Sequence, residues 1–155
     1  MNSLINNQQD NKYKQLRYGL FPISFNGCEI IAVHNAMLLL GKASYFPDMI
    51  NFFRHNHMCL LLGLFGSNVY KTGSILSKLG IPSIKVGLND IDSDGIYIIS
   101  FWNSHPPFHG IHTVTTVVKN GHFFTYNLYS NLGSVALGPK DYAKNRIIRA
   151  YKLVE

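Results

Sequence analysis

The sequence predicts an α+β domain in which N-terminal helices pack on one face of an antiparallel sheet. The first half of the chain carries long apolar segments of the kind that form helices, and the second half carries β-prone runs. Between two of these runs stands Asn120-Gly121, the strongest short-range signal for a β-hairpin. Helices followed by strands, rather than alternating with them, favour α+β over a parallel α/β fold.

The N-terminal region divides into a lead and the start of the domain. Residues 1–14 are rich in Asn and Gln, and we expect them to form a polar lead that is loosely attached to the rest. Residues 15–155 are expected to form a single domain, because a chain of 155 residues is of one-domain size. The segment 20–26 contains Pro22 and is predicted to be a loop.

The helices are predicted from apolar runs bounded by capping and breaking residues. Residues 28–40 are almost continuously apolar, which indicates a buried helix, with Asn26 as a plausible N-cap and Gly41 as its stop. Two further helices are expected at 47–57, where Pro47 suits an early helical position, and at 66–80, which begins at Gly66-Ser67-Asn68 and ends at Gly80.

The strands are predicted from runs of β-branched and aromatic residues. They are expected at 81–86, 95–102, 111–118, 122–129 and 147–153. Neither face of the run 111–118 is plainly polar, so we expect both faces of this strand to be covered.

Composition and charge exclude several classes of protein. The chain is 46% hydrophobic and 13% aromatic, which is typical of a packed globule. Its polar first 15 residues do not form a signal peptide, and the most apolar run, 58–65, is too short to span a bilayer. We therefore predict a cytoplasmic protein, with export by a route without a cleaved leader as the open alternative. The net charge of +6 comes from scattered cations without a nucleic-acid-binding motif, which disfavours nucleic acid as a partner.

Two groups of His and Cys residues raise the question of a metal site: His55, His57 and Cys59, and His105, His109 and His112. Neither group has the paired ligand spacings of zinc sites, so we predict no metal and no cofactor. Cys59 lies in an apolar run and is interpreted as a core residue. With two cysteines, the chain has no disulfide framework.

Cys28 is the residue that most directly indicates chemistry. It opens the predicted helix 28–40, and a thiol at a helix N-terminus lies at the positive end of the backbone dipole, which favours the reactive thiolate. A nucleophile of this kind needs an imidazole as base, and a group that orients the imidazole. Without such partners, Cys28 would be an ordinary buried thiol.

The predicted hairpin supplies a candidate pair of partners. If Asn120 and Gly121 form a two-residue turn, the numbers of facing residues sum to 241, so that Val114 lies opposite Asn127. His112 and Asn127 are then diagonal neighbours on one face, about 7–8 Å apart at the backbone, a separation that their side chains can bridge. The Asn127 amide would fix the tautomer of the imidazole.

This order of features resembles the papain-like cysteine peptidases, and most closely the compact bacterial branch similar to the C39 bacteriocin-processing peptidases. The resemblance covers about residues 18–131. It is carried by Asn26-Gly27-Cys28 and the helix that follows, by Gly66 to Gly80, and by Gly110-Ile111-His112-Thr113-Val114 to Tyr126-Asn127. It implies a papain-like fold and a Cys-His-Asn triad of Cys28 as nucleophile, His112 as general base and acid, and Asn127 as orienter.

The chain departs from this family at the oxyanion hole. The family usually has a Gln five or six residues before the Cys, where this chain has Pro22 and Ile23. Asn26 or the backbone N–H of Cys28 is the candidate substitute, and losing one oxyanion donor typically costs about 10²–10³ in rate. Trp102 and Phe108 flank the His112 strand and are candidates for the wall of a substrate cleft.

We therefore predict a cysteine-dependent hydrolase of the peptidase or amidase class that acts on an amide or other acyl bond of a peptide or protein. The alternative is a catalytically weak or inactive papain-like fold that serves as a peptide- or protein-binding module, which the missing Gln favours. Substrate specificity, the choice between hydrolysis and transfer, and the oligomeric state stay open at this stage, because substrate choice depends on loops.

Overall fold

The computed structural model describes residues 3–103, 110–128, 133–144 and 146–154. In these residues the α-helices are α1 (Asn11–Lys14), α2 (Ile23–Asn26), α3 (Cys28–Leu39), α4 (Phe46–His55), α5 (Thr72–Lys78) and α6 (Pro139–Tyr142). Short 3₁₀ turns are η1 (Leu61–Gly63), η2 (Val69–Lys71) and η3 (Leu88–Asp90). Among the described residues, no helix has both the length and the apolarity that crossing a bilayer requires.

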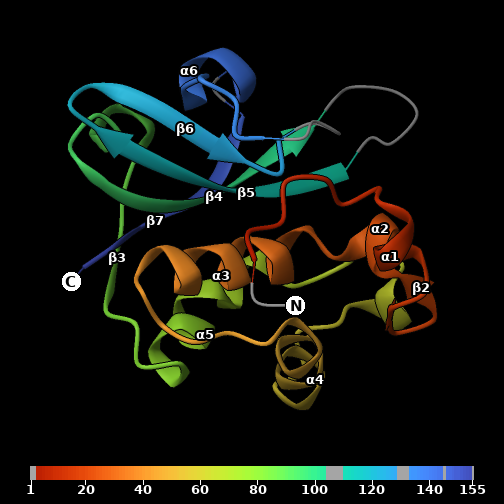
Figure 1. Cartoon of the computed structure of the whole chain (residues 1–155). Helices are drawn as coiled ribbons and strands as arrows, with labels where there is room; N and C mark the ends of the chain where they lie inside the picture. The colour runs from red at the N-terminus through yellow and green to blue at the C-terminus, as the bar shows by residue number, and fades with distance from the viewer. Residues whose placement is uncertain (1–2, 104–109, 129–132, 145, 155) are drawn as a thin grey trace.

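The described strands form one hairpin and one sheet. The hairpin pairs β1 (Arg17–Tyr18) with β2 (Phe21–Pro22). The sheet contains β3 (Ser83–Lys85), β4 (Gly95–Asn103), β5 (Gly110–Lys119), β6 (His122–Tyr126) and β7 (Ile147–Leu153). Within the described residues its order is β3-β7-β4-β5-β6 and each neighbouring pair is antiparallel (Figure 1). The α+β class predicted from the sequence is confirmed.

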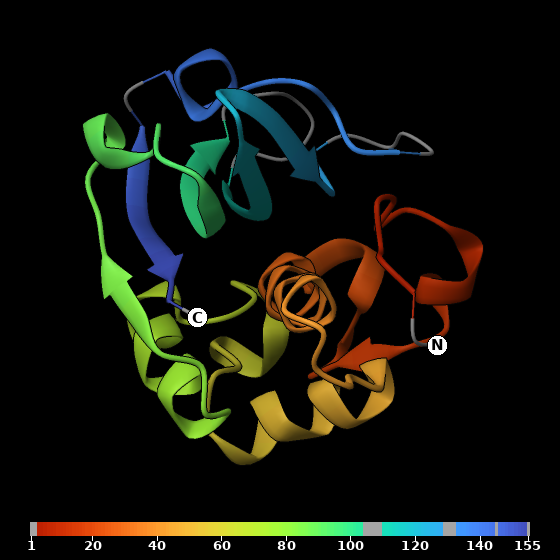
Figure 2. The ribbon, with the colours of Figure 1, turned by 60° about the vertical axis from the view of Figure 1, so that its left-hand side comes forward.

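Helix α3 is the central helix of the fold and lies directly under β5 (Figures 1 and 2). It starts at Cys28 as predicted, but its N-cap is Gly27, because Asn26 is the last residue of the short helix α2. A Cβ at Gly27 would lie 2.6 Å from the Cγ2 atom of Ile23, so the sharp junction between α2 and α3 requires glycine. The helix ends at Leu39, and the predicted stop, Gly41, follows the C-cap residue Leu40 with a φ of +69°.

The sheet is covered on both faces, as the sequence of β5 led us to expect. One core lies between the sheet and α3, α4 and α5, and includes Ile30, Ile31, Phe53, Leu76 and Ile98. A second core lies on the opposite face, where Tyr97, Ile99, Phe101 and Val114 pack with Tyr142 of α6. Figure 1 shows α3 and α6 on opposite sides of the sheet.

The β5–β6 hairpin has the register that the sequence predicts. Lys119 pairs with His122 and Thr115 pairs with Tyr126, so the numbers of facing residues sum to 241. Asn120 and Gly121 both have positive φ values, 52° and 75°, as a tight turn of this type requires. Regular pairing ends at Tyr126. The predicted strand is therefore too long, because residues 127 and 128 form a bend, and residue 129 lies outside the described residues.

The polar lead differs from the expectation. It is packed against the domain rather than loosely attached: Ile5 is 2% exposed, and its N–H and C=O both bond to the side-chain amide of Asn35 in α3. Tyr13, in α1, is also buried and meets Phe46 edge-on. The predicted loop 20–26 likewise contains β2 and α2. A few apolar residues and a buried Asn partner therefore order a segment that is polar on average.

Candidate active site

Cys28 is the first residue of α3, and its side chain is partly exposed. Its Sγ atom lies 3.9 Å from the carbonyl oxygen of Ile111, which belongs to the peptide unit that joins Ile111 to His112. The start of α3 thus places the thiol next to the backbone of β5, at the peptide unit that precedes the candidate base His112. Figure 1 shows the start of α3, next to α2, on the same side of the molecule as the start of β5.

The thiol of Cys28 is protonated near neutral pH in this conformation. Burial, and after it the neighbouring Glu29 carboxyl group, raise the pKa of Cys28 to about 11. The sequence argument expected the helix N-terminus to favour the thiolate. Desolvation outweighs that dipole effect here, so a thiolate at Cys28 needs a partner that takes the proton.

His112 lies on the face of β5 that points away from α3. Its ring packs edge-on against Phe101, with ring centroids 5.8 Å apart. Its Nε2 atom lies 2.7 Å from the main-chain oxygen of Asn127, and a carbonyl oxygen only accepts, so Nε2 carries the proton. The Nδ1 atom, which has no hydrogen-bond partner among the described residues, is then the basic nitrogen. Burial lowers the pKa of His112 and keeps the ring neutral.

Asn127 meets His112 as the hairpin count predicts, but through a different atom. Its side-chain amide, expected to orient the imidazole, bonds instead to Gln8: Oδ1 accepts from the Gln8 N–H at 3.0 Å, and Nδ2 donates to Oε1 at 3.2 Å. Asn127 has a φ of 60°, in the left-handed region that Asn tolerates better than most residues. This conformation accompanies the use of the main-chain carbonyl as the partner of the imidazole.

Gln8 is a site residue that the sequence reasoning missed. It is 9% exposed, and besides Asn127 it binds the segment before the nucleophile, because its Nε2 donates to the carbonyls of Ile23 and Ser24 in α2. The N-terminal lead therefore links the approach to Cys28 with the residue that holds His112. Its polar composition, interpreted as a sign of loose attachment, gave no signal of this role.

Cys28 and His112 are not paired in this conformation. Thr113 and Thr115 point toward α3, where they donate to Glu29 and to the carbonyl of Ala32. Because successive residues of a strand point to opposite faces, His112 points away from α3. Among the described residues, no hydrogen bond joins the thiol to the imidazole. The two groups flank one peptide unit of β5, in a resting arrangement where both are uncharged.

Asn26, the side-chain candidate for the oxyanion hole, has a structural role instead. Its Nδ2 donates to the carbonyls of Tyr18 and Gly63, at 2.8 and 2.9 Å, and the residue is 4% exposed. Both amide protons are thus committed to fixing α2 against η1. The backbone N–H of Cys28, the other candidate, is in the first turn of α3, where amides lack partners within the helix.

Of the two candidates for the wall of a substrate cleft, only Trp102 lies within the described residues. Trp102 pairs across the sheet with Ile111, on the α3 face, and 48% of it is exposed. The residue opposite it, Ile111, is the one whose carbonyl oxygen lies 3.9 Å from Cys28 Sγ. Phe108 lies outside the described residues. Ile111 and Phe25, the latter three positions before Cys28, are exposed apolar residues as well.

Glu29 is the second site residue that sequence reasoning missed. It follows Cys28 in α3 and is 1% exposed. Oε2 accepts from the Thr113 hydroxyl at 2.6 Å, and Oε1 accepts from the Thr72 hydroxyl. Burial raises the pKa of this carboxyl group, while hydrogen bonds from Thr113 and Thr72 oppose the rise. The available signal was a carboxylate in an otherwise apolar helix opposite a threonine-rich strand.

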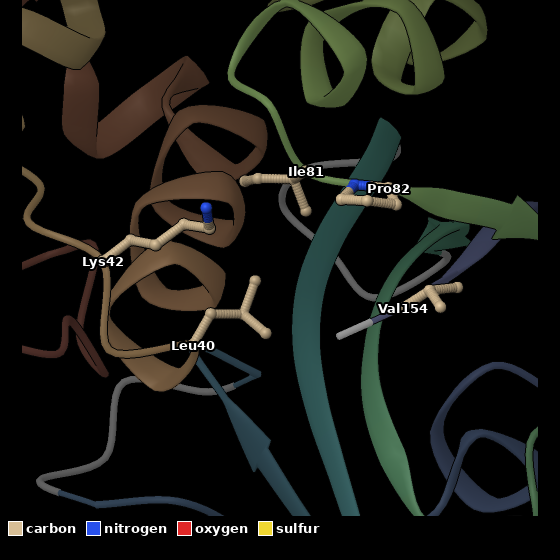
Figure 3. Close-up of a pocket in the computed structure, with 5 residues that line it drawn as sticks. All are labelled: Leu40, Lys42, Ile81, Pro82 and Val154. Atoms are coloured by element: carbon tan, nitrogen blue, oxygen red, sulfur yellow. The ribbon is translucent and has the colours of Figure 1, made fainter.

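Two further features lie outside this site. A hollow of about 400 Å³, lined by Leu40, Lys42, Ile81, Pro82 and Val154, opens at the C-terminal end of α3 (Figure 3). Twelve residues separate Cys28 from Leu40, about 18 Å along a helix, so this hollow is not part of the site. Within the described residues, no three His, Cys, Asp or Glu side chains gather as metal ligands.

Comparison of the backbone with solved structures identifies the fold. The chain superposes on the crystal structure of a double glycine motif protease from an AMS/PCAT transporter in complex with the leader peptide, with a TM-score of 0.53. The match covers 82% of this chain and 84% of that one, at 13% sequence identity. The chain has a C39-type protease fold. No family model and no curated protein matches the sequence. The structural likeness therefore stands alone, and what it establishes is the fold.

Proposed function

We propose that this chain is a cysteine-dependent peptidase or amidase, with Cys28 as nucleophile and His112 as general base and acid. The observation that carries the proposal is the placement of the thiol, at the start of α3 and 3.9 Å from the peptide unit that begins His112. The C39-type protease fold supports it. In place of the predicted Asn side chain, the main-chain carbonyl of Asn127 orients the imidazole.

The hydrogen bond between His112 Nε2 and Asn127 defines the direction of proton transfer. With the proton held on Nε2, Nδ1 presents the lone pair that can take the proton of Cys28. For this step, Nδ1 and Sγ, which lie on opposite faces of β5 in this structure, have to come within about 3–4 Å of each other. The resulting thiolate attacks the acyl carbon, and the imidazolium returns the proton to the leaving amine. The backbone N–H of Cys28 is the donor we assign to the developing oxyanion.

We propose a peptide as the substrate. The protease with the similar fold was crystallised in complex with a leader peptide, and in this chain the residue whose carbonyl contacts Cys28, Ile111, has an exposed apolar side chain. Trp102, Ile111 and Phe25 would contact apolar side chains near the bond that is cut.

An iodoacetamide labelling series tests the catalytic pair. In the Cys59→Ser variant, Cys28 is the only thiol of the chain, so the rate constant of labelling reports on Cys28 alone. If His112 activates the thiol, His112→Ala should slow labelling at pH 7.5 by about tenfold or more, which is the effect of one pKa unit on the thiolate fraction. His122→Ala, at the exposed end of the same hairpin, is the matched control and should leave the rate unchanged.

Turnover is tested with a peptide mixture and detection of cleavage products by mass spectrometry. Cleavage that Cys28→Ala and His112→Ala both abolish supports the proposal. Labelling that does not respond to His112→Ala, together with no cleavage, contradicts it.

The second candidate is a binding module without turnover. It is favoured by the unpaired resting arrangement of Cys28 and His112 and by the pKa of about 11 for the thiol. This function predicts that peptides bind the unsubstituted protein and Cys28→Ser equally well and are recovered intact. Peptide capture by Cys28→Ser combined with cleavage by the unsubstituted protein excludes it.

A further inference from the structure

We propose that Glu29 is a positioning residue for the proposed nucleophile: its carboxyl group ties the start of α3 to the strand of His112, and its charge controls how readily Cys28 ionises. The inference deepens the proposed function and rests on it, because the role of Glu29 matters only if Cys28 is the nucleophile. Its test measures thiol chemistry alone and needs no substrate.

The positioning part rests on the contacts of the carboxyl group. Glu29 directly follows Cys28, and Thr113 directly follows His112, so the 2.6 Å hydrogen bond between them joins the neighbours of the proposed nucleophile and base. Thr113 Oγ1 also lies 3.0 Å from Ser100 Oγ, which extends the connection to β4. The second carboxyl oxygen binds Thr72, at the start of α5. One side chain therefore fixes the first turn of α3 against three other segments.

The proton count allows the carboxyl group to exist in two charge states. Thr72 Oγ1 lies within hydrogen-bond distance of both Glu29 Oε1 and the Val69 carbonyl, 2.8 Å away, but a hydroxyl has one proton to donate. If Glu29 is protonated, it donates to Thr72, and Thr72 donates to Val69. If Glu29 is ionised, Thr72 turns its proton to the carboxylate. The same heavy-atom positions serve both states.

The charge of Glu29 acts on Cys28 because nothing around it neutralises that charge. Within the described residues, no Lys, Arg or His forms an ion pair with Glu29. The groups that face it are hydroxyls from Thr72, Thr113 and Ser100. A carboxylate there opposes the thiolate of Cys28, whereas a protonated carboxyl group does not.

Two other titratable groups share this surrounding and define the useful pH range. Tyr18 senses the Glu29 charge, but burial raises the pKa of its hydroxyl, so it stays neutral. His112 points to the opposite face of β5, and burial lowers its pKa below 6.5, so above that pH it is neutral. A measurement from pH 6.5 to beyond the Cys28 pKa of about 11 therefore reports on Cys28 and on the Glu29 charge beside it.

The experiment is the pH profile of iodoacetamide labelling in the Cys59→Ser background. Glu29→Gln keeps the shape of the side chain and, like the protonated carboxyl group, offers one acceptor oxygen and one donor group, but it carries no charge. It should move the labelling midpoint about one pH unit lower, which is about tenfold faster labelling at a fixed pH below the midpoint. Asp90→Asn, which removes an exposed carboxylate that accepts from Gly87 N–H, is the matched control and should not move the midpoint.

A second measurement, made with Glu29 in place, does not depend on the folding of that variant. A fall with rising pH in the ratio of labelling by anionic iodoacetate to labelling by neutral iodoacetamide marks the ionisation of Glu29 and supports the proposal. Equal midpoints with and without the Glu29→Gln substitution, together with a ratio that does not change with pH, overturn it. A midpoint shift leaves this inference standing even where the His112→Ala labelling series and the cleavage assay contradict the proposed function.

Discussion

The role of the Asn127 carbonyl can be separated from that of its side chain by two substitutions. Asn127→Gly removes the side chain but accepts the φ of 60°, so the carbonyl keeps its direction toward His112. Asn127→Ala removes the same side chain, but in a residue for which the left-handed region costs about 1–2 kcal/mol. If the carbonyl orients the imidazole, glycine should preserve that function better than alanine.

The expected magnitudes follow from the contacts. Both variants lose the two hydrogen bonds to Gln8, about 1–3 kcal/mol of folding free energy at 0.5–1.5 kcal/mol each. The 2.7 Å bond from Nε2 becomes charge-assisted when His112 is protonated, and such bonds contribute about 1.5–3 kcal/mol. Losing most of that contribution lowers the pKa of His112 by about one unit or more, since one unit corresponds to 1.36 kcal/mol.

The assay is NMR of the imidazole nitrogens of His112 as a function of pH, with urea unfolding of the same samples. We expect Asn127→Gly to keep the Nε2–H tautomer and a His112 pKa within about half a unit of the unsubstituted protein. Asn127→Ala should lower that pKa further. Gln8→Ala, which leaves Asn127 in place, is the control. It should lower the free energy of unfolding but change the pKa of His112 little. An equal loss of the tautomer in the glycine and alanine variants refutes orientation by the carbonyl.

Three further predictions concern the surrounding framework. Asn26→Ala should lower the free energy of unfolding by about 1–3 kcal/mol, because it removes two buried hydrogen bonds; unchanged stability with slowed turnover would instead favour an oxyanion role. Gly63→Ala should destabilise much more than Gly80→Ala in urea unfolding, because a Cβ at Gly63 would lie 2.7 Å from Asn26 Nδ2, whereas nothing lies within 4 Å at Gly80; equal midpoints contradict this. Burial lowers the pKa of His34 below 6.5, so the folded state binds fewer protons and stability should fall as pH drops from about 6.5 through the folded pKa. His34→Gln should reduce that slope in pH-dependent unfolding, and an unchanged slope contradicts the assignment.

The β5–β6 hairpin and α3 could be predicted from the sequence because their signals are local. The Asn120-Gly121 turn determines which residues face each other, and the register that follows placed His112 beside Asn127. The apolar run that ends at Gly41 likewise located the helix that starts at Cys28. These features depend on residues within about 15 positions of one another in the chain.

The atoms that make the contacts could not be predicted, because distant residues decide them. The Asn127 amide bonds to Gln8, 119 positions away, and only then does the carbonyl become the partner of His112. The Asn26 amide bonds to Gly63, 37 positions away, which removes it as an oxyanion donor. Glu29 was missed for the same reason, since its partner Thr113 is 84 positions away. Periodicity identifies a buried face but not the hydrogen-bond partner on it.

The link between Gln8 and Asn127 also sets when the site can be completed during synthesis of the chain. Asn127 is synthesised 119 residues after its partner Gln8. At about 5–20 residues per second, that interval lasts about 6–24 seconds. Throughout it, Gln8 lacks its two hydrogen bonds to Asn127, and His112 lacks its orienting carbonyl. The proposed base is therefore positioned only after residue 127 has joined the fold, long after Cys28 has been made.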